Sequence, residues 1–119
     1  MLRSLSLIAM ALLYVVAGIN HFWHPATYVH IMPDYFPAKH MLNILAGISE
    51  IVLGALLFPK ATRRFAAFGI IAMLVAFLTV HIWMIQKGGS YFNLPDWALW
   101  VRLVVGQPLL IWWAWSNRN

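Results

Sequence analysis

The sequence contains no cysteine, and this single absence excludes a group of functions. Disulfide exchange, thiolate catalysis, iron–sulfur ligation and covalent attachment of c-type haem all require thiols. The chain therefore carries no iron–sulfur cluster and no covalent haem of its own. Any redox role must use a non-covalent cofactor, such as a quinone, or a partner subunit.

Charged residues are also few. Only 9% of the 119 residues are charged, and 63% are hydrophobic. A soluble domain carries about a quarter charged residues, so this chain has too few to cover a water-facing surface. The net charge is +5, but the basic residues are scattered and flank apolar runs. That distribution is typical of membrane proteins and argues against nucleic acid as a partner.

Ligand patterns for metals are also missing. Glu50 is the single glutamate, whereas a four-helix di-iron site needs several carboxylates with Glu-x-x-His pairs. His21 and His24 are three residues apart, but Pro25 interrupts the helix there. The sequence predicts no metal site, and nothing further in it supports a haem held between His21 and His81.

Four apolar segments are present, and each is close to the roughly 20 residues needed to cross about 30 Å of hydrocarbon. They lie at about residues 4–22, 40–58, 65–86 and 97–115. The first follows Arg3 and lacks a clear small-x-small cleavage site, so we expect it to be retained as a helix. The pattern predicts an all-α, four-transmembrane-helix bundle forming one polytopic domain over residues 1–119, with the lipid bilayer as its solvent.

Basic residues predict the orientation. One side of the predicted bundle carries five of them and the other carries two. The five are Arg3, Lys60, Arg63, Arg64 and Arg118, and the two are Lys39 and Lys87. The positive-inside rule then places both termini in the cytoplasm, with the protein in the plasma (inner) membrane. The first loop, residues 23–39, contains three prolines and several aromatic residues, and we expect it to lie on the bilayer surface.

Polar residues share faces with small ones inside two of the segments. Asn43, Gly47 and Glu50 are spaced by four and three residues, which puts them on one helix face. Tyr14 and His21 share a face of the first segment, and Asn20 stands beside His21. Such a stripe indicates either a cavity wall or a close helix contact in which Glu50 makes a hydrogen bond across the interface.

The ionisable residues of different segments are predicted to lie at comparable depths in the outer half of the membrane. At about 1.5 Å per residue, His81 and Arg102 lie roughly 7 Å from the outer ends of their helices, and Glu50 lies roughly 15 Å from its own. Ionisable residues inside a membrane suggest a functional site by default. We therefore predict an outward-opening ligand pocket between helices one, three and four, beneath the first loop. The candidate residues are His21, Glu50, His81, Arg102, Asn20 and Tyr14. The alternative is a structural Glu50–Arg102 ion pair.

Gln107 is expected to have a different role from the pocket residues. It follows Arg102 by five residues, so the two side chains would point about 140° apart on an ideal α-helix. Pro108 removes a backbone donor and should distort helix four nearby. We expect Gln107 to hydrogen-bond the carbonyl that Pro108 leaves free.

The ordered motifs resemble the DoxX family of small four-helix membrane proteins. They are AGINHF at residues 17–22, IMP at 31–33, FP at 36–37 and AGISEI at 46–51, followed by Gly54, Arg63-Arg64, Arg102 and Gln107. His81 departs from that pattern, because related sequences commonly have an asparagine there. The resemblance implies the four-helix architecture. It also implies a link to membrane redox chemistry, since relatives include a quinone-reducing thiosulfate oxidoreductase and an oxidative-stress complex with soluble partners.

Three hypotheses follow for the function. In the first, the chain is a redox-associated subunit with a quinone or other small hydrophobic ligand, working with a soluble or membrane redox partner. His81 or Glu50 would exchange protons, and Arg102 would bind a carbonyl or anionic oxygen. In the second, it is a non-enzymatic scaffold or anchor for a partner protein. In the third, it forms a homo-oligomer that transports small solutes.

Overall fold

The computed structural model describes residues 2–119, and the described chain is helical without strands. Four helices are long and apolar enough to cross a membrane. They are α1 (Leu2–Trp23), α3 (Lys39–Leu56), α4 (Lys60–Lys87) and the continuous stretch Asp96–Ser116. That last stretch consists of α6 (Asp96–Val101), the π-helix η1 (Arg102–Gly106) and α7 (Gln107–Ser116). The predicted all-α, four-helix membrane architecture is confirmed.

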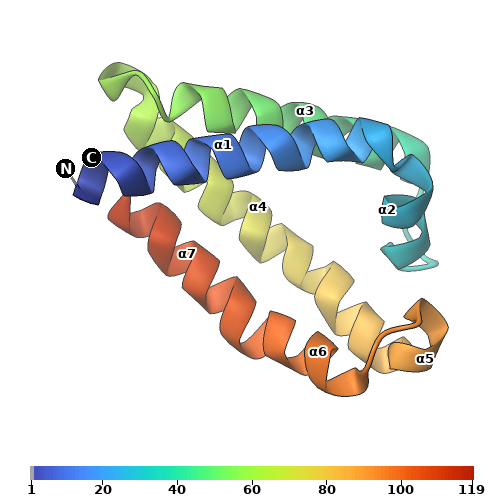
Figure 1. The fold of residues 1–119 in the computed structure, drawn as a ribbon. Coiled ribbons are helices and arrows are strands. Elements are labelled where there is room, and N and C mark those ends of the chain that lie inside the picture. Colours follow the sequence, from blue (N-terminus) through green and yellow to red (C-terminus); the bar gives the residue numbers. More distant parts are fainter. Residues whose placement is uncertain (1) are drawn as a thin grey trace.

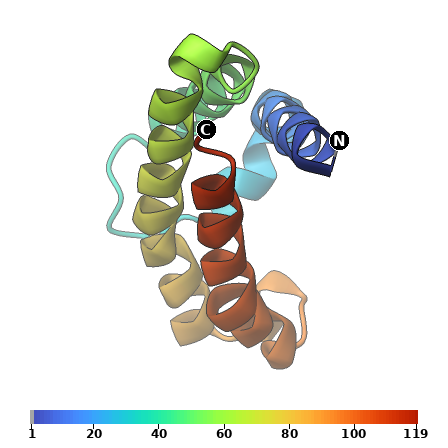
Figure 2. The same cartoon turned by 90° about the vertical axis from the view of Figure 1, so that its left-hand side faces the viewer.

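The helices form two pairs (Figure 1). In one pair α1 and α3 run side by side, and in the other α4 packs against α7. The pairs meet at the end that holds both termini and spread apart toward the end that holds two short helices, α2 (Pro25–Ile31) and α5 (Gly89–Phe92). Figure 2 shows α4 and α7 side by side, with α1 set apart from α7. The wedge between the pairs positions the candidate site.

Close contact between α1 and α3 follows from their glycines. A Cβ atom added at Gly18 would lie 2.6 Å from the backbone oxygen of Gly47, and one added at Gly54 would lie 2.9 Å from that of Ala11. Real Cβ atoms do not approach backbone so closely, so only glycine permits this helix separation. The small-residue stripe is thus a helix contact, as membrane helices commonly use.

The apolar core lies at the narrow end of the wedge. Its largest buried members include Met10, Tyr14, Leu57, Ile70 and Leu74. Many other large apolar side chains face outward, among them Val16, Val52 and Leu109 at 62%, 47% and 59% exposed. In water this surface would be unfavourable, whereas a bilayer offers an apolar solvent for it.

The second loop is shorter than the sequence suggested. The third predicted helix was expected to start near residue 65, but α4 begins at Lys60, directly after Pro59. The side chains of Thr62 and Arg63 then donate to the carbonyls of Leu56 and Leu57 at 2.7 and 2.8 Å. These bonds satisfy acceptors that the end of α3 leaves free, so the basic turn also serves as a helix cap.

Both termini lie at the same end of the bundle (Figure 1). Ser6 Oγ lies 3.2 Å from Asn117 Oδ1, and Trp113 Nε1 donates to Ser6 Oγ at 2.7 Å. At the opposite end, Asp34 pairs with Lys39 at 3.7 Å and with Lys87 at 3.5 Å. The first loop is therefore fastened to the end of α4, above the wide part of the wedge.

Candidate functional site

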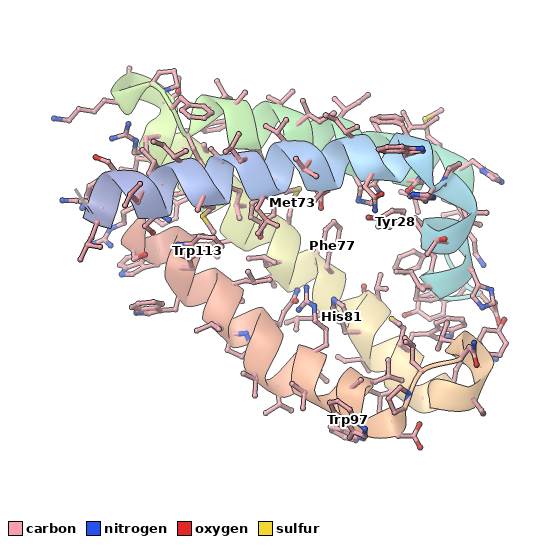
Figure 3. The ribbon with its side chains drawn as sticks, in the orientation of Figure 1. Tyr28, Met73, Phe77, His81, Trp97 and Trp113 are labelled. Atoms are coloured by element: carbon pink, nitrogen blue, oxygen red, sulfur yellow. The ribbon has the colours of Figure 1, made fainter. Side chains whose placement is uncertain are left out.

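A cavity of about 250 Å³ lies in the wide part of the wedge and draws residues from both helix pairs. Its lining includes four residues that the sequence did not single out together, namely Tyr28, Ile31, Phe77 and Val80. Its polar residues are His21, Glu50, His81 and Arg102. In Figure 3, Tyr28 and Phe77 point into the space between the pairs, and His81 lies on the side of α4 that faces η1. The four main candidates thus share one cavity, which α2 covers.

His21 and Asn43 hold α1 and α3 together by a reciprocal pair of hydrogen bonds. The Nδ1 atom of His21 lies 2.7 Å from Oδ1 of Asn43, and Nδ2 of Asn43 donates to the backbone oxygen of His21 at 2.9 Å. Both residues are buried, at 5% and 2% exposed. This arrangement fixes the ring of His21 and leaves its other nitrogen facing α3.

Glu50 lies at that second nitrogen. Its Oε2 atom is 3.1 Å from Nε2 of His21, and both side chains are 7% exposed. Although the distance is short, Oε2 has no aligned hydrogen-bond donor among residues 2–119. The contact is therefore an ion-pair approach with imperfect alignment, and Glu50 retains capacity for a further hydrogen bond. Glu50 also lines the cavity, which places its side chain beside any molecule bound there.

Tyr28 connects α2 to this group. Its ring stacks on the ring of His21 at a centroid distance of 3.8 Å. Its hydroxyl oxygen accepts a hydrogen bond from Nδ2 of Asn20 at 2.7 Å. Asn20 therefore acts on the site through Tyr28 and does not line the cavity itself. Tyr14, another predicted member, belongs to the apolar core cluster.

The other helix pair contributes a cationic wall. Nη1 of Arg102 donates to Oε1 of Gln107 at 2.5 Å, and Nε2 of Gln107 donates to the backbone oxygen of Leu74 at 2.5 Å. Gln107 is fully buried. Among residues 2–119 neither Arg102 nor His81 has a carboxylate within ion-pair distance. A positive charge therefore faces the cavity with only an amide as its partner.

Helix geometry explains why Arg102 and Gln107 meet. The expectation that they point apart is wrong, because residues 102–106 form a π-helix in which Gln107 N donates to Arg102 O. An i→i+5 turn brings residues five apart onto a similar face, which an α-helix does not do. Pro108, the second residue of α7, lies two residues after this segment, so the expected distortion takes the form of a π-turn. The role expected for Gln107 is also wrong, since it binds Leu74 on α4.

The alternative of a direct Glu50–Arg102 ion pair is not what the structure shows, because no salt bridge joins the two side chains among residues 2–119. Glu50 pairs with His21 in the first helix pair, and Arg102 bonds Gln107 in the second. Glu50 lies on α3 and Arg102 on η1, and these elements belong to the two helix pairs that spread apart (Figure 1), so the opposite charges line the cavity from different pairs. The sequence placed both residues inside apolar helices but could not say which neighbour each would take.

Sequence reasoning missed three contributors to the site. Asn43 was considered only as part of a polar stripe, although its spacing from Glu50 places both on the buried face of α3. Tyr28 and Phe77 carry no local signal, because aromatic residues are abundant throughout the chain. Among residues 2–119, no group of three or more His, Asp or Glu is placed to hold a metal ion.

Comparison with known families adds one finding. Residues 10–118 match the model of a family described as a domain of unknown function, DUF8561. The chain belongs to this family. No curated protein and no solved structure matches the chain. The family description states no activity, so function must be argued from the cavity.

Proposed function

We propose that this membrane protein binds the headgroup of a quinone in the cavity and acts as a redox-associated subunit. One observation carries the proposal: a single cavity has a carboxylate and an imidazole on one wall, and on the other a cation that has no carboxylate partner among residues 2–119. Glu50 with His21 forms the first wall, and Arg102 with His81 forms the second. A ligand with polar oxygens at both ends of an apolar body is complementary to such a site.

The middle of the cavity suits a flat ring. Phe77, Val80 and Ile31 line it, and the ring of Tyr28 covers His21. Ligand pockets are mostly apolar with a few placed polar groups. The volume of about 250 Å³ favours a single ring over a complete lipid quinone. The guanidinium of Arg102 would donate to one ring oxygen, while Glu50 or His21 would meet the other.

The electrons would come from a partner. The chain has no thiol to carry them, so a soluble or membrane redox protein would deliver them to the bound quinone. The resemblance to the DoxX family supports this role, because some of its members take part in membrane redox reactions. With both termini in the cytoplasm of a plasma (inner) membrane protein, as the basic residues favour, the cavity would lie toward the outer face.

A binding titration tests the proposal. Protein in lipid nanodiscs is titrated with a short-chain benzoquinone, and binding is followed by tryptophan fluorescence and equilibrium dialysis. Arg102→Gln should weaken binding about ten- to a hundredfold, because a hydrogen bond from a charged group contributes about 1.5–3 kcal/mol. The control is Arg64→Gln, which removes an arginine far from the cavity and should change nothing. Equal affinity of the wild type and Arg102→Gln, or no binding by the wild type, would refute the proposal.

A second candidate function is a scaffold or anchor for a partner protein. The reciprocal His21–Asn43 bonds and the glycine contacts favour it, because they fasten α1 to α3 without any ligand. Under this reading, Glu50→Gln lowers stability and leaves benzoquinone affinity unchanged. Under the first proposal the same variant lowers affinity. An oligomeric transporter would instead require solute flux in proteoliposomes.

A further inference from the structure

The hydrogen bonds of Asn43 determine where the protons of His21 lie. A backbone carbonyl only accepts, so the atom of Asn43 that bonds His21 O at 2.9 Å must be the amide nitrogen. The amide oxygen of Asn43 then faces Nδ1 of His21 at 2.7 Å. Because that oxygen also only accepts, Nδ1 must carry a hydrogen. Asn43 thus selects one tautomer of His21.

The choice of tautomer has a consequence for Glu50. A neutral ring with hydrogen on Nδ1 has a bare lone pair at Nε2, which lies 3.1 Å from Oε2 of Glu50. Two acceptors at this distance repel each other. One more proton, on either Nε2 or Oε2, turns the repulsion into attraction. The pair is then either imidazolium with carboxylate or imidazole with carboxylic acid, and both forms are neutral overall.

Without Asn43, His21 and Glu50 could form a favourable contact with one proton fewer between them. The ring could then carry its hydrogen on Nε2 and donate it to ionised Glu50, which would leave a net charge of −1. An isolated charge in a membrane is costly, and the neutral pair avoids that cost. Asn43 therefore keeps one additional proton between His21 and Glu50, at a point where Glu50 borders the cavity.

We propose that His21 and Glu50 share one transferable proton, that Asn43 is the positioning residue that keeps it there, and that the pair delivers it to a basic oxygen of the bound ligand. The delivery step rests on the proposed function. The bond from the proton to Nε2 or Oε2 breaks, an O–H bond forms on a phenolate-type oxygen, and the pair is left with one negative charge. Arg102 on the opposite wall would stabilise the ligand oxyanion before transfer.

Other ionisable groups lie near His21 and Glu50, and their titration must be distinguished from that of His21. Tyr28 from α2, His81 from α4 and Arg102 from η1 line the same cavity, and Tyr14 is buried on α1. None of them forms the reciprocal amide bonds that fix the tautomer of His21. A measurement that reads the nitrogens of His21 directly therefore separates its titration from theirs.

The first experiment is ¹⁵N NMR of histidine-labelled protein in nanodiscs, with His21 assigned by comparison with His21→Gln. Protonated and bare ring nitrogens have well-separated shifts. In the wild type Nδ1 should remain protonated across the accessible pH range, and the shared proton should depart only on alkalinisation. Asn43→Leu should move the hydrogen to Nε2. A bare Nδ1 in the wild type would overturn the proposal, and this result does not depend on whether Asn43→Leu folds.

The second experiment tests delivery with 4-nitrophenolate, whose absorption distinguishes phenolate from phenol. The wild type should bind it with loss of the phenolate band. Glu50→Gln should retain the band, because the Gln amide can donate to Nε2 but has no proton to transfer. Bound probe that keeps its phenolate band in the wild type overturns the delivery step. Absence of binding overturns delivery together with the proposed function, whereas the NMR result on the shared proton stands by itself.

Discussion

His21 and Glu50 join the first two membrane crossings through a contact of 3.1 Å between Nε2 and Oε2. This pairing compensates the carboxylate within the α1–α3 pair. It leaves Arg102 on the opposite wall of the cavity with an amide partner, Gln107. The separation of the charges gives the cavity two chemically different walls.

We predict strong energetic coupling between His21 and Glu50. Replacing either residue with leucine leaves the other buried polar side chain without its partner. The substitution should lower the free energy of unfolding by about 3–5 kcal/mol. The double variant should cost less than the sum of the two single ones. Denaturant unfolding in mixed micelles measures all four proteins. The comparison cycle pairs Glu50 with Arg102, where no direct contact exists, and stronger coupling there would contradict the assignment.

A methyl group on Gly18 should weaken the α1–α3 contact. The new Cβ would lie 2.6 Å from the Gly47 oxygen, so the helices must separate. Overpacking of this kind costs about 1–3 kcal/mol. Unfolding in mixed micelles should show that loss for Gly18→Ala. Ala9→Val, which enlarges an exposed position on the same helix, is the matched control and should leave the stability close to that of the wild type.

His81→Asn should keep the fold and the quinone affinity but flatten its pH dependence. Histidine can bind a proton, and a protonated His81 would place a second positive charge in the cavity with Arg102. Asparagine keeps hydrogen-bonding capacity and does not titrate. Benzoquinone titrations from acidic to neutral pH give the profile, and Glu50→Gln in the same background assigns any remaining slope to the His21–Glu50 pair. A profile identical to that of the wild type would rule out this role for His81.

The orientation can be tested with reporter fusions. A reporter after Asn119 should locate to the cytoplasm, because the basic residues gather at the end of the bundle that holds the termini. A reporter inserted between Gly88 and Asp96 should locate to the opposite side. Cytoplasmic signal from the second position, or periplasmic signal from the first, would contradict the predicted topology.

Much of the architecture could be predicted from local sequence. Helices in lipid must satisfy their own backbone groups, so four apolar runs of sufficient length predict four crossings. Their boundaries were less accurate, as α4 shows. Its first turn, residues 60–64, is too basic to be read as part of a membrane span, yet the helix begins at Lys60, directly after Pro59, and Arg63 caps α3.

Local sequence alone predicted which ionisable residues lie within the four apolar helices, because hydropathy depends only on the order of residues. Only the tertiary structure decided their partners. Glycine contacts bring α1 close to α3, so that Glu50 lies against His21. The spreading of the two helix pairs keeps Arg102 away from Glu50. The π-turn at residues 102–106 then turns Gln107 toward Arg102. Such pairings depend on helix separation and local helix geometry, and neither follows from the spacing of residues along an ideal helix.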